Sequence, residues 1–102
     1  MRLRRGDLVQ VIRGAESPKR GKVLRVLEDE DQVIVQGVNL VYKHMRRSQK
    51  YPQGGRIQKE ASIAISNVML VDPELDRPVR VRAGTDSEGK KVRVSVKTGN
   101  PI

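Results

Sequence analysis

Apolar residues occur along this sequence in short runs that alternate with polar residues, and clusters of turn-forming residues separate the runs. Short runs that are rich in valine and isoleucine are typical of β-strands. No segment carries the sustained apolar stripe of a surface helix. The sequence therefore predicts an all-β domain of the small-barrel type, with strands expected at 7–13, 21–27, 32–36, 38–42 and 62–71.

The connections between these strands have distinct compositions. Four consecutive acidic residues, Glu28–Asp31, predict a solvated turn, because like charges side by side repel one another in a packed element. Gly37 lies between two apolar runs and predicts a bulge or bend. We expect the stretch around it, from Gln32 to Tyr42, to be the most buried part of the chain.

A second kind of segment follows this apolar stretch. From Lys43 to Gln49 the chain is polar and basic, Tyr51–Gly55 is rich in turn formers, and Arg56–Lys59 leads back. Such a path out and back predicts an extended hairpin arm over about 43–59. Its length beyond the barrel indicates a functional projection rather than a simple connector.

The tail of the chain has the clearest alternation of apolar and basic positions. Valines and one alanine occupy every second position before and after a turn at Asp86–Gly89. The alternation predicts a hairpin with Val79, Val81, Ala83, Val92, Val94 and Val96 on one face and Arg80, Arg82, Arg93 and Lys97 on the other. An isolated hairpin is marginally stable, so the valine face is expected to pack on the barrel. We therefore divide the chain into a barrel with its arm, 1–75, and a C-terminal β-hairpin extension, 76–102.

The composition fits a small protein whose core is built from aliphatic side chains. The chain has 102 residues with no Phe and no Trp, so branched aliphatics, valine above all, must fill the core. It has no Cys, which excludes disulfides and thiolate metal sites. The apolar runs are too short for a signal peptide or a membrane span, so we expect a cytoplasmic protein with no membrane partner.

The charge pattern indicates an anionic partner. Lys and Arg number 21 against 12 Asp and Glu, a net charge of +9. Charges of both signs interspersed would satisfy solubility, whereas segregated basic segments produce a directed field that attracts phosphates. The basic residues of the first quarter are Arg2, Arg4, Arg5, Arg13, Lys19, Arg20, Lys22 and Arg25, and those of the arm are Lys43, Arg46, Arg47, Lys50, Arg56 and Lys59.

The small number of aromatic residues narrows the expected mode of nucleic-acid binding. Proteins that bind single strands stack bases on surface rings, and this chain has only Tyr42 and Tyr51. Aromatic stacking therefore cannot be the main mode. Contacts from Arg and Lys to phosphate, with recognition of the shape of folded RNA, are expected instead.

Catalysis and metal binding find little support in the sequence. The single histidine, His44, has basic neighbours and no nearby carboxylate to orient it. The acids of Glu28–Asp31 lack the interleaved spacing and the glycine of a calcium loop. Gly14 and Gly21 lack the spacing of a phosphate-binding P-loop, and Val23 stands where such a loop needs Ser or Thr. We expect no catalytic residue, no metal and no cofactor.

Several motifs resemble those of a known protein family. Residues 6–14 and 19–23, GDLVQVIRG and KRGKV, resemble the KOW motif of ribosomal proteins and NusG-type transcription factors. Residues 33–41 with Lys43 and His44, residues 54–61, 66–68 and 89–93 are similar to the bacterial large-subunit ribosomal protein 24 family. The resemblance covers nearly the whole chain.

The resemblance implies an SH3-like barrel in the large ribosomal subunit, bound to the 5′ domain of its 23S-type rRNA. It also implies an early role in subunit assembly, a hairpin arm (His44–Gly55) near the exit tunnel and its nascent chain, and neighbouring large-subunit proteins around a monomer. The chain departs from many relatives at Ala15, Ser17 and Pro18, where fewer phosphate contacts are expected. The zinc-type Cys pairs of some relatives are also missing.

The expected contacts combine the basic residues with the motif positions. Those for rRNA are Arg2, Arg4, Arg5, Arg13, Lys19, Arg20, Gly21, Lys22, Lys43, His44, Arg46, Arg47, Lys50, Arg56, Lys59, Arg80, Arg82, Lys90, Lys91 and Arg93. Those of the exit-tunnel arm are Ser48, Gln49, Tyr51, Pro52, Gln53, Gly54 and Gly55. The alternative is a KOW module of a transcription-elongation factor or another RNA-binding factor. Elongation factors carry a separate domain ahead of the motif, whereas this sequence begins almost at it.

Overall fold

The computed structural model describes residues 3–45 and 55–102, and within them the chain is all-β, as predicted. The strands are β1 (Leu8–Val11), β2 (Arg20–Leu27), β3 (Gln32–Val35), β4 (Leu40–Met45), β5 (Gly55–Glu60), β6 (Ile63–Ala64), β7 (Val68–Asp72), β8 (Arg77–Pro78), β9 (Val81–Thr85) and β10 (Lys91–Ser95). Two single-turn 3₁₀ helices, η1 (Glu28–Glu30) and η2 (Ile65–Asn67), join strands. The acidic run thus forms the exposed connection that its charge predicts.

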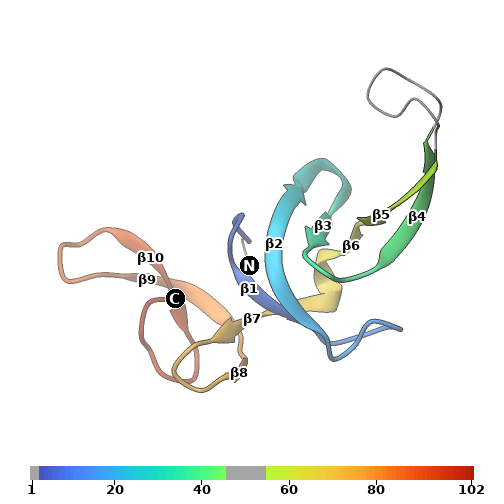
Figure 1. The fold of residues 1–102 in the computed structure, drawn as a ribbon. Coiled ribbons are helices and arrows are strands. Elements are labelled where there is room, and N and C mark those ends of the chain that lie inside the picture. The colour runs from blue at the N-terminus through green and yellow to red at the C-terminus, as the bar shows by residue number, and fades with distance from the viewer. Residues whose placement is uncertain (1–2, 46–54) are drawn as a thin grey trace.

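Six strands form one antiparallel sheet in the order β6-β3-β2-β1-β7-β8. Figure 1 shows this sheet curling around itself, with the arm rising on one side and the C-terminal hairpin projecting on the other. The arrangement is consistent with the predicted SH3-like barrel. The molecule is elongated, 56 × 28 × 23 Å, because the arm and the C-terminal hairpin extend from a small barrel.

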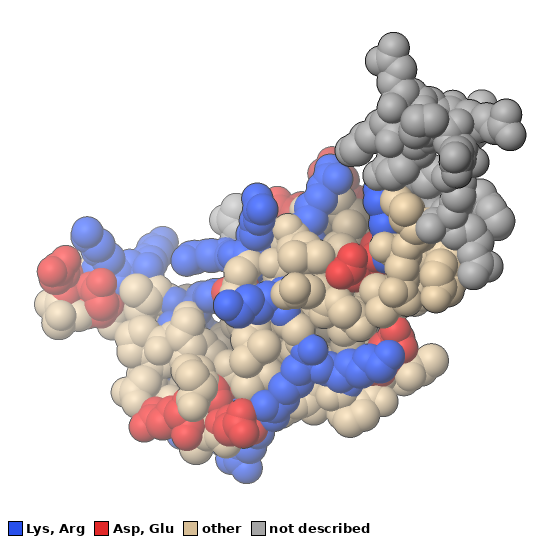
Figure 2. Space-filling view, viewed as in Figure 1, with Lys and Arg blue, Asp and Glu red and all other residues tan. Residues whose placement is uncertain are grey.

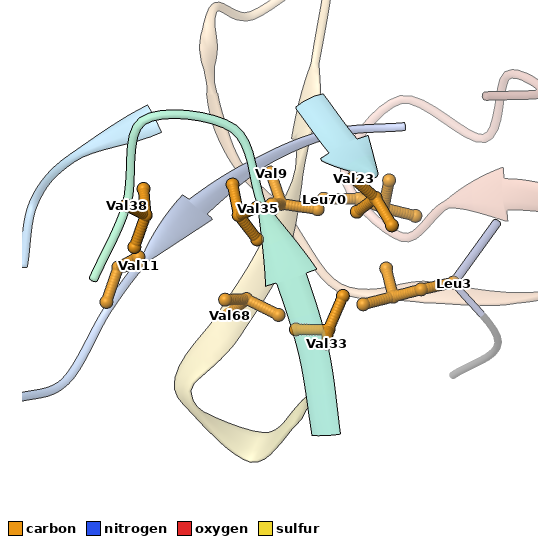
Figure 3. Close-up of a cluster of buried hydrophobic side chains, with 9 residues drawn as sticks. All are labelled: Leu3, Val9, Val11, Val23, Val33, Val35, Val38, Val68 and Leu70. Atoms are coloured by element: carbon orange, nitrogen blue, oxygen red, sulfur yellow. The ribbon is translucent and has the colours of Figure 1, made fainter. Parts of the chain in front are cut away.

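The core of the barrel is built almost entirely from valine. In β1 and β3 the side chains point alternately into and out of the barrel, so every second residue is buried. The buried cluster consists of Leu3, Val9, Val11, Val23, Val33, Val35, Val38, Val68 and Leu70 (Figure 3). Each such side chain contributes about 1.5 kcal/mol or more by leaving water. The valine-built core expected from the composition is confirmed.

The prediction that Gln32–Tyr42 is the most buried stretch is wrong in its second half. Val33, Val35 and Val38 are buried, but Leu40, Val41 and Tyr42 are 42%, 40% and 60% exposed. These three residues belong to β4, which pairs with β5 alone in a separate two-stranded sheet. A ribbon of two strands leaves both faces open, so its apolar residues stay at the surface.

The β4–β5 ribbon is the predicted arm. Its register runs from Leu40 opposite Glu60 to Met45 opposite Gly55, so the arm begins earlier than the expected Lys43. The end of the arm, residues 46–54, lies outside the described residues. The arm leaves the barrel at Gly37, whose φ of +75° and neighbouring turn confirm the predicted bend.

The C-terminal hairpin pairs β9 with β10 around the expected turn at Asp86–Gly89. Arg82 lies opposite Val94, and Val81 lies opposite Ser95. Residues directly opposite in an antiparallel pair point to the same face. The prediction of one valine face and one basic face is therefore wrong. The two strands alternate as expected, but a pairing offset by one residue puts their valines on opposite faces.

The hairpin is nevertheless packed on the barrel, as predicted. Val81 and the last residue, Ile102, pack against the core cluster. On the other face Val94 is buried and forms a β-bridge with Pro101 in the chain that follows. Because β8 also pairs with β7, hydrogen bonds cross the boundary drawn at 75/76, and the two-part division stays a proposal. No helix among the described residues has the length and apolarity to cross a membrane.

Candidate nucleic-acid interface

The KOW-like segment contains a close approach between two backbones. A Cβ at Gly21 would lie 2.3 Å from the carbonyl oxygen of Gln36 and 2.9 Å from Val35 Cγ1, far inside contact distance. The amide of Gln36 also donates a hydrogen bond to the carbonyl of Lys22 at 2.9 Å. Glycine is therefore required at position 21 for steric reasons, because the two chain segments meet too closely for a side chain.

The loop between β1 and β2 is tied to the rest of the barrel by Glu16. The carboxylate of Glu16 accepts hydrogen bonds from the backbone amide of Asn39 and, at 3.2 Å, from Lys19 Nζ. The hydrogen bonds from Lys19 and from the Asn39 amide hold the pKa of Glu16 below its usual value. Lys19 is therefore positioned by an intramolecular partner, although its side chain remains 54% exposed.

Arg20, a predicted rRNA contact, donates three hydrogen bonds to residues that are distant in sequence. Its Nε donates to Gln10 at 2.7 Å, and its two Nη atoms donate to the carboxylate and the carbonyl of Asp76 at 2.7 and 2.8 Å. The pair joins the start of β2 to the turn before β8. Arg20 thus links the barrel to the C-terminal extension in this structure.

Arg93, another predicted contact, is directed inward. Its Nη atoms donate to both carboxylate oxygens of Asp7, at 2.7 and 2.9 Å, and the two side chains are 16% and 13% exposed. Asp7 also accepts the backbone amide of Arg4 at 2.6 Å. Arg93 therefore stabilises the fold, and we leave it out of the proposed interface.

The ionisation of Asp7 predicts acid sensitivity. Burial alone would raise the pKa of Asp7, but the hydrogen bonds and charge of Arg93, with the amide of Arg4, hold it below the usual value. The unfolded chain, with an Asp pKa of about 3.9, then binds more protons than the folded chain as pH falls through this range. The free energy of unfolding is expected to decrease as pH drops below about 4 towards the folded pKa.

Urea denaturation at a series of pH values measures this decrease. An Asp7→Asn variant, which cannot titrate at this position, should show a shallower decrease than the unaltered chain. Identical slopes in the two proteins would contradict the assignment.

Two hollows bring predicted contact residues together. Arg4 and Arg5 line an open groove of about 830 Å³ with Arg25 of β2. Arg13 and Arg80, distant in sequence, line a smaller hollow of about 360 Å³. Arg25 is one of the segregated basic residues but is not among the residues expected to contact rRNA. The sequence feature that could have identified Arg25 as a contact is its position on the same predicted strand as Lys22.

The remaining predicted residues fall into three groups. Some have exposed side chains on the described surface: Lys22, Lys59, Arg82, Lys90 and Lys91. Others lie on the strands of the arm, where only the backbone is described: Lys43, His44, Gly55 and Arg56. The rest lie outside the described residues: Arg2, Arg46, Arg47, Ser48, Gln49, Lys50, Tyr51, Pro52, Gln53 and Gly54.

The charged side chains on the face shown in Figure 2 form two zones. Lys and Arg extend along the upper edge, from the C-terminal hairpin towards the arm. A second basic group at the lower edge lies beside acidic side chains. No group of three or more potential metal ligands occurs among the described residues. On this face, cations available to phosphate are therefore most numerous along the upper edge, and those at the lower edge lie close to carboxylates.

Comparisons with known proteins point to one family. Residues 38–102 match the family described as large ribosomal subunit protein uL24, C-terminal domain. The relative from Halothermothrix orenii is 54% identical over 93 residues, which cover 91% of this chain and 89% of the relative. Those from Thermotoga neapolitana and Exiguobacterium sibiricum are 49% and 47% identical over 102 residues, covering all of this chain and 95% and 98% of the relatives. All three relatives carry the name large ribosomal subunit protein uL24.

Proposed function

This chain belongs to the uL24 family of large ribosomal subunit proteins, and we propose that it binds the 5′ domain of the large-subunit rRNA through phosphate contacts. Members of this family are structural components of the ribosome and are not enzymes. This agrees with the ribosomal role and with the lack of catalysis that the sequence predicts. Because bacterial ribosomes are in the cytoplasm, a member of this family is a cytoplasmic protein. The names of the relatives favour this role over a module of a transcription factor.

The observation that supports rRNA binding most directly is a set of exposed cations, which we call the cationic surface. It consists of Arg4 and Arg5 in one hollow, Arg13 and Arg80 in the other, and Lys22 on β2. Cations gathered in this way neutralise phosphates and displace counterions, which is the main source of affinity for RNA. Such a surface does not need to recognise individual bases, because folded RNA presents its phosphates in a fixed pattern.

We further propose that the β4–β5 arm reaches towards the exit tunnel and that the protein acts early in subunit assembly. The resemblance in sequence motivates both statements. The exposed apolar residues Leu40 and Val41 at the base of the arm fit a segment that packs against neighbouring rRNA or ribosomal proteins in the subunit. A ribbon of two strands gains stability from such a neighbour.

A double variant of exposed cations tests the rRNA contact. Arg13→Ala with Lys22→Ala should weaken binding to a fragment of the 5′ domain about tenfold, since each exposed charge pair contributes up to about 1 kcal/mol. The slope of log affinity against log salt should become less steep by about 1.4 to 1.8. Lys19 and Arg20 are avoided because both hold intramolecular carboxylates.

The matched control is Arg77→Ala with Lys97→Ala, which removes the same charge at exposed positions outside the predicted contacts. Its slope should stay close to that of the unaltered chain. If both double variants change the slope equally, net charge rather than a defined interface determines the affinity, and the proposal fails.

A further inference from the structure

The groove that contains Arg4, Arg5 and Arg25 is built by two parts of the fold. The N-terminal segment forms one wall, and it is fixed because Leu3 is buried in the barrel core. The amide of Gly6 donates to the carbonyl of Val23 at 2.8 Å and ties the segment to β2, and the amide of Asp7 donates to the carbonyl of Arg4 at 3.1 Å and closes the turn between them. The arginines of this segment therefore stand at defined positions rather than on a loose end.

A β-bulge in β2 forms the other wall. The pairing of β2 with β3 shifts register between Val23 and Arg25, so Leu24 is the extra residue on the bulged strand. Leu24 is 39% exposed, Arg25 is exposed, and both line the groove. A regular strand would place consecutive side chains on opposite faces. The bulge brings an apolar and a cationic side chain to the same groove.

The combination of guanidinium groups with an apolar wall suits an unstacked nucleotide. A guanidinium binds phosphate through paired hydrogen bonds and also offers a flat face on which a base can stack. Leu24 and Val26 provide hydrocarbon surface for a base. A regular RNA duplex presents phosphates and sugars but hides its base faces, so it would leave this wall uncovered. The volume, about 830 Å³, lies within the range of small-ligand sites.

The charge along the groove gives the nucleotide a direction. A neighbouring hollow, which shares Arg25, Val26 and Glu28 with the groove, is lined further on by Asp29 and Glu30. Arg4 and Arg5 line only the groove itself. Carboxylates repel phosphate but accept hydrogen bonds from the amino groups on base edges. The phosphate is therefore favoured at the arginines of the N-terminal segment and the base edge near Glu28.

We propose that this groove binds one unstacked nucleotide from a bulge or loop of rRNA. Its phosphate lies at Arg4 and Arg5, and its base stacks on the guanidinium of Arg25 beside Leu24. This inference rests on the proposed rRNA binding, because it names the element of RNA structure that one part of the cationic surface recognises.

Two RNA hairpins test the inference with the full chain. One carries a single bulged nucleotide in its stem and the other is fully paired, so their phosphate numbers are almost equal. The chain should bind the bulged hairpin about fivefold or more tightly at constant salt, which is the expected scale for stacking one base. Arg25→Lys keeps the charge but removes the flat guanidinium, and it should abolish this preference without changing the salt slope. The matched control, Arg77→Lys at an exposed position outside the predicted contacts, should retain the preference.

Melting temperatures verify that both variants fold. Equal affinity of the unaltered chain for the two hairpins overturns the groove assignment while leaving its binding to the 5′-domain fragment in place. A preference that survives in Arg25→Lys overturns it as well. A chain that binds none of these RNAs overturns both the groove assignment and the proposed function.

Discussion

Replacing Gly21 with alanine should lower the free energy of unfolding by about 3 kcal/mol, the upper part of the usual range for overpacking. The new Cβ would lie 2.3 Å from a backbone carbonyl oxygen, that of Gln36. A side chain could rotate away, but here β2 or the end of β3 must move. That movement would also disturb the hydrogen bond from the Gln36 amide to Lys22. Urea denaturation of the full chain measures the loss.

Gly89→Ala separates the steric cost from the general cost of replacing a glycine. Gly89 has a φ of +79° and no atom within 4 Å of the position of a Cβ, so only backbone strain arises, about 1 kcal/mol. If Gly21→Ala is no more destabilising than Gly89→Ala, the close approach at Gly21 does not constrain the fold.

Breaking the Asp7–Arg93 pair should destabilise the protein by about 3 to 5 kcal/mol, because one charge then remains buried without its partner. The pair is largely shielded from water and joins residues 86 positions apart, at the start of the barrel and in the C-terminal hairpin. Asp7→Asn keeps the size of the side chain and removes the charge. Its unfolding midpoint in urea, compared with that of the unaltered chain, gives the effect.

A double-mutant cycle identifies the source of this loss. Arg93→Met keeps most of the apolar stem of Arg93, and the combined variant Asp7→Asn with Arg93→Met buries no unpaired charge. The combined variant should be more stable than the sum of the two single losses predicts. Additive losses would mean that the two charges do not interact, and single losses below about 0.5 kcal/mol would mean that the pair is not important for the fold.

The strands and the core could be predicted from the sequence because both follow from local alternation. In each valine-rich run, such as Val33 to Val35, the alternation of buried and exposed positions can be seen without knowing which strands lie beside it. The positions of the arm and of the turn at Asp86–Gly89 follow in the same way, since turn formers mark them. The fold class therefore needs little information about distant contacts.

The two predictions that were wrong, the faces of the C-terminal hairpin and the burial of Leu40–Tyr42, depend on how segments of the chain pair with each other. The register of β9 with β10 is offset by one residue, which alternation within either strand cannot reveal. Leu40–Tyr42 are exposed because β4 has only one neighbouring strand. The sequence of an apolar strand does not show whether the strand lies in a two-stranded ribbon or in a barrel. Tertiary pairing overrides the local pattern in both cases.

The candidate interface shows the same division. Basic residues are visible in the sequence, but their partners are not. Arg20 and Arg93 hold Asp76 and Asp7, each far away along the chain, and these pairs reduce the set of cations available to a ligand. Arg25 gains its place in the groove through a bulge in β2, a feature that the sequence pattern does not report. Charge composition predicted the class of partner, whereas the structure selects the residues.

Crosslinking of protein to rRNA in isolated large subunits would show which residues of this chain contact the RNA. Ultraviolet irradiation followed by mass spectrometry identifies the residues that touch RNA. We expect crosslinks within Leu3–Arg5, at Lys22 and Arg25, and near Arg80, with none at Asp29–Asp31 or around Asp76. Crosslinks that avoid these cations, or that occur equally on all sides of the barrel, would contradict the proposed interface.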